Sequence, residues 1–183
     1  MNRYQLTKNF YLDEFYDVVT YHNHRIKGSL DQLANALDLV LISALQQIRD
    51  YMNEPASIND WWKVYVKHNG DLKKTLAEVK AKRIDQWSGV RFPNSPYFSP
   101  GSQHSYTRRK AADVIFKSNG WLPKAQSFVY HRFKTLGLGG MEVNVSWLHV
   151  DTRKLNPQAK RIFTFDMDSA EPNWKPFYKE SQI

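Results

Sequence analysis

Apolar residues recur three and four positions apart over residues 29–53, which is the spacing of one face of an α-helix. Ser29 and Gln32 have the form of a capping box at the start of this pattern, and Glu54-Pro55 ends it. The sequence therefore predicts one long amphipathic helix that packs on the core through its apolar positions, which are Leu33, Leu37, Val40, Leu41, Ala44, Leu45 and Ile48.

Residues 54–82 are interpreted as a helical insertion made of two short elements. Residues 60–68 combine tryptophans with valines and a tyrosine, a composition that suits a short helix or a strand. Asn69-Gly70 is a stop signal, and Asp71 stands where it would cap a second helix. The apolar positions of that second helix are Leu72, Leu76 and Val79.

Turn residues divide the second half of the chain into shorter elements. Three prolines mark residues 92–100 as a loop. The pattern then predicts a short buried strand at 111–116, a helix at 123–136 and a second strand at 141–150. The remaining residues, 156–183, carry aromatic side chains among polar ones and are interpreted as a C-terminal tail that packs on the body or on a partner.

The composition is that of one globular domain with a proper core. The chain has 183 residues, of which 42% are hydrophobic and 24% charged, which excludes a disordered chain. It contains no cysteine, so disulfides, thiolate catalysis and cysteine-based zinc sites are all excluded. Any metal ion must therefore be held by histidine and carboxylate side chains.

The formal charge of +8 and the isoelectric point near 9.6 predict an anionic partner. Cell-wall polymers and nucleic acid both fit this charge, and a basic surface without a specific ligand fits it nearly as well. No apolar run approaches the roughly 18 residues of a membrane span. The first residues also lack the apolar region of a signal peptide.

Three short polar motifs suggest a chemistry directly. They are S-Q-H at 102–104, A-A-D at 111–113 and H-V-D at 149–151. Two histidines and a carboxylate are the donor set of a catalytic zinc ion, which takes three protein ligands and keeps a fourth position open. Zinc in such a site lowers the pKa of a bound water, so that the water becomes a nucleophile near neutral pH.

Together with S-G-x-R at 88–91, these motifs form an ordered series that resembles the zinc D,D- and L,D-peptidases of peptidoglycan stem peptides. That family includes the VanY-type D-alanyl-D-alanine carboxypeptidases and the L-alanyl-D-glutamate endopeptidases of phage endolysins. Residues 6–15 and 45–50 also resemble the family, so the match runs from about residue 5 to about 155. The resemblance implies an α+β fold of the hedgehog/DD-peptidase type, a small antiparallel sheet with flanking helices, over residues 1–155.

The resemblance also implies roles for individual residues. His104, Asp113 and His149 match the Zn²⁺ ligands. Arg91 matches the arginine that holds a substrate carboxylate or carbonyl, a task that suits a planar guanidinium with parallel N–H groups. Substrate contacts at the rim of the site are implied for two further residues, Ser102 and Gln103.

The sequence departs from the family at the catalytic base. Ser146 stands where many members carry the acidic residue, which leaves Glu142 and Asp151 as substitutes. Asp151 is better placed to brace His149 than to act as a base. On a straight strand Glu142 would lie over ~20 Å from His149. These positions favour weak or absent hydrolysis with the metal site retained.

The spacing of the metal motif is also longer than usual. The family has seven positions from the first histidine to the aspartate, whereas His104 and Asp113 are nine apart. An insertion of two keeps both side chains on the same face of a strand, because side chains alternate along it.

The leading functional interpretation is a zinc-dependent peptidase acting on peptidoglycan peptides, as a phage lysin or a virion-associated enzyme. Without a signal peptide, such an enzyme would stay in the host cytoplasm until lysis or be carried in a virion. The alternative is a catalytically degenerate copy of the fold that serves as a structural or binding component of a phage particle, with other phage structural proteins as partners. A third interpretation, a basic nucleic-acid-binding protein, rests on charge and lacks a recognisable module.

Overall fold

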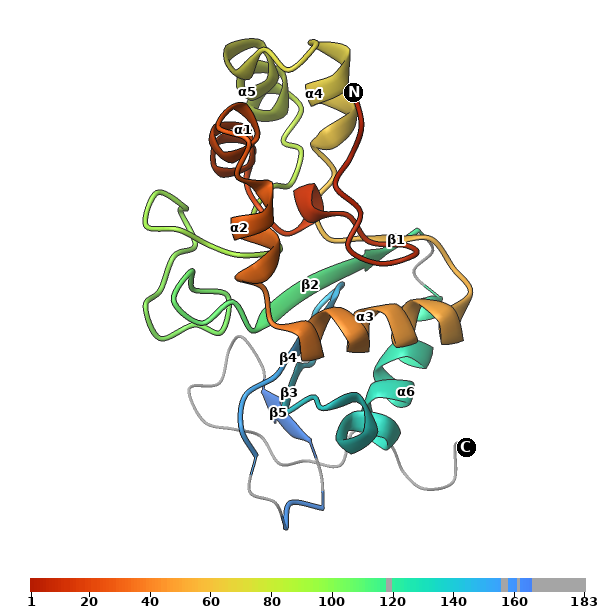
Figure 1. Ribbon diagram of the computed structural model, residues 1–183. Coiled ribbons are helices and arrows are strands. Elements are labelled where there is room, and N and C mark those ends of the chain that lie inside the picture. Colours follow the sequence, from red (N-terminus) through yellow and green to blue (C-terminus); the bar gives the residue numbers. More distant parts are fainter. Residues whose placement is uncertain (118–119, 156–157, 161, 166–183) are drawn as a thin grey trace.

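Five short strands form one small sheet in the computed structural model, which describes residues 1–117, 120–155, 158–160 and 162–165. The order of the strands across the sheet is β1-β2-β4-β3-β5 (Figure 1). Their bounds are β1 Ala56–Ser57, β2 Ala111–Phe116, β3 Gly140–Glu142, β4 Leu148–Asp151 and β5 Phe163–Phe165. With six α-helices among the described residues, the protein is a mixed α and β structure, in agreement with the predicted class.

The sheet is not wholly antiparallel, which corrects the prediction. The β1–β2, β2–β4 and β3–β4 pairs are antiparallel, whereas β5 pairs with β3 in parallel. The chain reverses after β4, so β5 runs in the same direction as β3. Residues 163–165 of the predicted tail thus extend the sheet, and residues 166–183 lie outside the described residues.

Alternation along β2 gives the sheet two different faces. Val114 and Phe116 approach Leu45 and Ile48 of α3 (Leu39–Met52) on one face. Asp113 has the opposite parity and therefore points to the other face of the sheet. Since α3 packs against α6 (Trp121–Leu136) and α6 contacts β4, these two helices cover the apolar side of the sheet (Figure 1).

The predicted helix over residues 29–53 is in fact two helices, α2 (Leu30–Asn35) and α3. The break is explained by Asp38, whose side chain accepts hydrogen bonds from the backbone N–H groups of Val40 and Leu41 and so starts a new helix. Ser29 makes no capping bond with its side chain, so the predicted capping box does not form. Asn53, in the left-handed conformation, ends α3 as predicted for this region.

The insertion at 54–82 is helical, as predicted, in α4 (Trp62–Lys67) and α5 (Leu72–Ala81). Asp71 accepts a hydrogen bond from the backbone N–H of Lys74 and caps α5. The helices α1 (Val18–Ile26), α4 and α5 gather at the end of the molecule away from α6 (Figure 1). None of the helices in the described ranges has the length and apolar character that crossing a membrane requires.

A strand from 141 to 150 was predicted, and that prediction is wrong. The segment folds into β3 and β4, which are joined by a turn over residues 143–147. Asn144 lies in the left-handed region with φ of 61°, a conformation that asparagine tolerates better than most residues. The turn lays β3 antiparallel against β4, with Met141 opposite Val150.

Candidate metal centre

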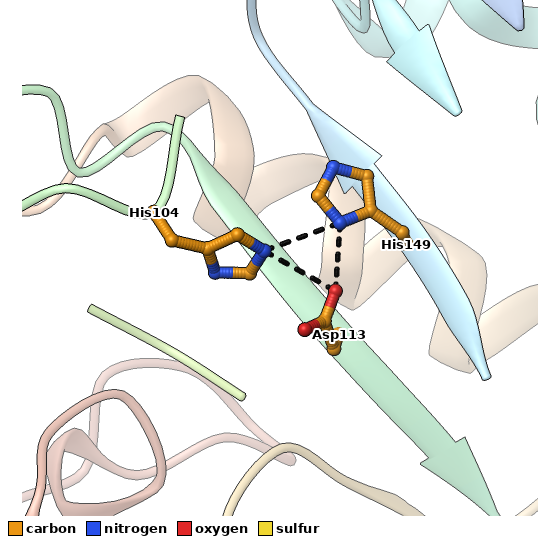
Figure 2. A group of neighbouring side chains, drawn as sticks. All are labelled: His104, Asp113 and His149. Atoms are coloured by element: carbon orange, nitrogen blue, oxygen red, sulfur yellow. Dashed lines mark hydrogen bonds and ion pairs between the residues drawn. The ribbon is translucent and has the colours of Figure 1, made fainter. Parts of the chain in front are cut away.

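Three side chains converge on one point on the sheet face opposite α3. The ligand atoms of His104, Asp113 and His149 all lie within 4.8 Å of one another, and all three residues are buried. His149 Nδ1 is 2.7 Å from Asp113 Oδ1, and His104 Nε2 is 3.2 Å from each of these two atoms. Figure 2 shows the three side chains pointing toward one another.

The strand register explains why two of these residues meet. Asp113 of β2 and His149 of β4 are direct cross-strand partners, so their side chains stand next to each other on the same face. His104 comes from the loop that precedes β2 (Figure 2). Its side chain completes the group from outside the sheet, because residues 104 and 113 are separated by the turn that leads into β2.

The backbone of residues 88–91 holds two of the three site residues, Asp113 and His104, in place. The N–H of Asp113 donates to Ser88 O at 2.9 Å, and the N–H of Arg91 donates to His104 O at 2.8 Å. Gly89 O accepts a hydrogen bond from His104 Nδ1 at 2.8 Å. A Cβ on Gly89 would lie 2.4 Å from the carbonyl oxygen of Phe15, so this position requires glycine.

The outer hydrogen bonds leave one ring nitrogen of each histidine facing the centre. Because a carbonyl only accepts, His104 Nδ1 carries its proton toward Gly89, and Nε2 faces Asp113. His149 Nε2 lies 3.4 Å from Asp151 Oδ2, which leaves Nδ1 for the centre. Asp151 is held in turn by the guanidinium of Arg153, whose Nε lies 2.8 Å from Oδ1. Histidine ligands of metals are commonly oriented by such carboxylate and carbonyl partners.

The three residues of the centre differ in their protonation. Burial raises the pKa of Asp113, but the two histidines outweigh it and hold the pKa well below its usual range. Burial lowers the pKa of His104. Burial also opposes the charging of His149, yet Asp113 and Asp151 raise the pKa of His149 to about 9. The metal-free centre at pH 7 is therefore a carboxylate bridging a neutral and a protonated imidazole.

The donor set fits a metal ion. Two imidazole nitrogens and one carboxylate oxygen, all buried, could bind one ion at a shared point. Tetrahedral zinc with bonds of ~2.1 Å would separate its ligand atoms by ~3.4 Å. The observed separations between ligand atoms, 2.7 and 3.2 Å, are shorter than that value by an amount that small side-chain rotations can supply.

Arg91 lies in the same cavity as the centre. Its Nη2 donates to Asp113 Oδ2 at 2.7 Å and its Nε donates to Trp87 O at 2.8 Å. Nη1 makes no hydrogen bond to the described part of the chain and remains available for a ligand. The cavity has a volume of about 520 Å³, and Ser102 also lines it. Gln103 does not line it and lies instead in a neighbouring hollow.

Glu142 is brought to the centre by the β3–β4 hairpin. Its Oε2 lies 4.0 Å from His149 Nδ1, in place of the separation of over ~20 Å expected for a straight strand. The register of β3 with β4, continued by one residue beyond the Met141–Val150 pair, sets Glu142 opposite His149. Burial raises the pKa of the Glu142 carboxyl. Asp113, His149 and Glu142 thus form a row across three neighbouring strands.

Two cavity features were missed from the sequence. Trp147 lines the cavity, and its indole N–H lies close enough to Glu142 to lower the pKa of that carboxyl. The same N–H is buried and makes no hydrogen bond of normal geometry among the described residues. Asp85 also lines the cavity and accepts a hydrogen bond from the hydroxyl of Ser88. For Trp147 the sequence did offer a signal, because it stands two positions before His149.

Comparison of the chain with protein-family models, curated proteins and solved structures finds no match in any of the three.

Proposed function

We propose that the protein is a zinc-dependent peptidase that cleaves peptide bonds in peptidoglycan stem peptides. The observation that carries this proposal is the row formed by Asp113, His149 and Glu142, with His104 closing the centre. It combines a histidine and carboxylate donor set for zinc with a further carboxylate beside it. The peptidoglycan substrate is supported by the order of the sequence motifs.

Zinc bound by His104, Asp113 and His149 would supply an activated water and would polarise the scissile carbonyl. The protein's own side chains then have distinct tasks. Glu142 is the general base: its Oε2 lies 4.0 Å from His149 Nδ1, the atom that would bind the ion, so a water activated there would lie within reach of this carboxylate. Burial raises the pKa of Glu142, which makes its carboxylate a stronger base.

Arg91 orients the substrate. Its Nη2 and Nε are held by Asp113 and by the carbonyl of Trp87, so the guanidinium plane is fixed before a ligand arrives. The remaining Nη1 would donate to a carbonyl or carboxylate of a substrate bound in the cavity that Arg91 lines. Ser102 shares this cavity and adds a hydroxyl. Asp151 acts as the brace of His149, because its carboxylate is buried and engaged by Arg153.

A second candidate function is a metal-binding relic without turnover that serves as a component of a phage particle. It is favoured by Ser146, which is exposed in the turn before β4 and supplies no carboxylate at the usual position of the base. The two proposals differ in whether Glu142 replaces that acid. They agree on the metal centre, so zinc binding alone does not separate them.

The test is digestion of purified peptidoglycan and of synthetic stem peptides with the zinc-loaded protein, followed by mass spectrometry of the products. The peptidase proposal predicts a single type of new amino and carboxyl terminus within the stem peptide. His149→Ala is the control and should contain no zinc and produce no cleavage. Full zinc occupancy in the wild type without any new terminus would establish the relic instead.

A further inference from the structure

A second hollow, of about 530 Å³, lies where the loop before β2 meets the chain that follows β4. Four of the six lining residues are cationic and none is acidic. The lining consists of Gln103, Thr107, Arg108, Lys110, Arg153 and Lys154. Such a concentration of positive charge in a concave surface attracts anions more strongly than the same charges spread over a convex one.

Among the residues that the structure describes, three of the four cations have no carboxylate partner. Arg108, Lys110 and Lys154 make no ion pair with any described residue, whereas Arg153 is paired with Asp151. Asp151 does not neutralise the other three, because it is fully buried and already engaged by Arg153 and His149. Within the described part of the chain, the hollow therefore presents positive charge that no carboxylate compensates.

The backbone that carries two of these cations is fixed in advance. The N–H groups of Arg108 and Arg109 both donate to Ser105 O at 2.8 Å. The N–H of Lys110 donates to Gln103 O at 2.9 Å. Arg109 adopts the left-handed conformation with φ of 53°, which costs energy for a residue with a side chain. A ligand that binds here meets a loop that needs little further ordering.

We propose that this hollow binds the phosphodiester groups of an anionic polyol-phosphate polymer of the bacterial cell wall. Arginine forks and lysine ammonium groups are the usual partners of phosphate oxygens, and the amide of Gln103 and the hydroxyl of Thr107 can add neutral donors. Naming the wall as the source of the phosphate rests on the proposed function.

The lining argues against single-stranded nucleic acid as the ligand. Proteins that bind single strands stack the bases on aromatic side chains, and no aromatic residue among those described lines this hollow. A polyol-phosphate chain has no bases and requires only charge and hydrogen-bond donors.

The position of the hollow links it to the metal centre. Gln103 precedes the ligand His104 in the chain, and Lys110 leads directly into β2, which carries Asp113. A wall polymer held in the hollow would keep the enzyme close to peptides of the same wall and so raise the local concentration of substrate.

Binding of purified poly(glycerol phosphate) to the full chain tests the proposal, measured by titration calorimetry at low and moderate salt. The double variant Arg108→Gln, Lys110→Gln should bind at least about tenfold more weakly, and its affinity should depend less steeply on salt, by about one unit of slope per lost phosphate contact. The matched control is Lys73→Gln, Lys80→Gln, which removes the same charge from exposed positions on α5. This control should keep the affinity within about twofold.

Equal losses in the two double variants would show that only the net charge matters and would overturn the proposal. Stronger binding of a single-stranded oligonucleotide with the same number of phosphates would assign the hollow to nucleic acid and overturn it as well. The assay is repeated with His149→Ala, which should bind the polymer as the wild type does. Cleavage of a short stem peptide without phosphate should be unchanged in Arg108→Gln, Lys110→Gln, so failure of the peptidase proposal is observed separately.

Discussion

Zinc binding to the metal-free protein at pH 7 is expected to release about one proton. Asp113 and Asp151 raise the pKa of His149 to about 9, against the effect of burial, so His149 is protonated at pH 7. A metal ligand must be a neutral imidazole, and this proton therefore has to leave. The other two ligands contribute none, because the pKa of Asp113 is held well below its usual range and that of His104 is lowered by burial.

The size of the effect follows from the two units between pH 7 and the pKa of His149 of about 9. The apparent zinc affinity at pH 7 should be about a hundredfold weaker than its limit above pH 9, and it should rise about tenfold per pH unit in between. Titration calorimetry at pH 7 in buffers with different ionisation enthalpies measures the released protons as the slope of observed enthalpy against buffer enthalpy.

The expected slope corresponds to at least about one proton per zinc ion. Asp151→Asn is the informative variant, because it removes one of the two carboxylates that raise the pKa of His149. It should release less than the wild type and show a weaker pH dependence. A slope near zero for the wild type would refute the charge assignment of the centre.

Three further predictions concern stability, positioning and substrate binding. In the metal-free protein, the raised pKa of His149 stabilises the fold below pH 6.5, and this stabilisation is lost as the pH rises to about 9. Denaturant titrations over this pH range should show the free energy of unfolding fall by at most about 3 kcal/mol. Gly89→Ala should weaken zinc binding about ten- to hundredfold in chelator competition, because it displaces the carbonyl that orients His104. Gly101→Ala is its control, since a Cβ there meets no atom within 4 Å. Arg91→Lys should keep zinc but lower kcat/KM for stem peptides at least about tenfold, because an ammonium group cannot reproduce the geometry of the guanidinium.

Strand parity could be read from the sequence for Asp113 and His149, but not for His104, which was expected on the same strand face as Asp113 and lies instead in the loop before β2. A strand at 111–116 and another through residue 149 predict side chains on defined faces, and β2 and β4 have these residues. The register that makes Asp113 and His149 direct partners is a tertiary property, because it depends on how two segments 36 positions apart align.

The turn inside 141–150 was hidden by its own composition. Val143 and Val145 continue an apolar alternation that is typical of a strand, and Asn144 between them was the only turn signal. This turn brings Glu142 into the site, since it moves the carboxylate from the far end of a strand to 4.0 Å from His149. The break between α2 and α3 was missed for a similar reason. The apolar periodicity runs unbroken through Leu37, and it does not reveal that the side chain of Asp38 caps a new helix.

The contacts that orient the histidines could not be predicted from sequence. The carbonyl of Gly89 carries no residue-specific signal, although the glycine itself is required by the approach of Phe15. Arg153 follows the H-V-D motif by two positions, and its contact with Asp151 requires Gly140, where a Cβ would lie 2.5 Å from the Asp151 carboxylate.

The proposed peptidase activity depends on Glu142 acting as the general base. The most direct test is the rate of stem-peptide cleavage by the wild type and by Glu142→Gln at equal, measured zinc content. We expect full zinc occupancy in both proteins and a rate about 10²- to 10⁴-fold lower in the variant, which is the usual contribution of a positioned base. Equal rates in the two proteins, or no cleavage by fully zinc-loaded wild type, would contradict it.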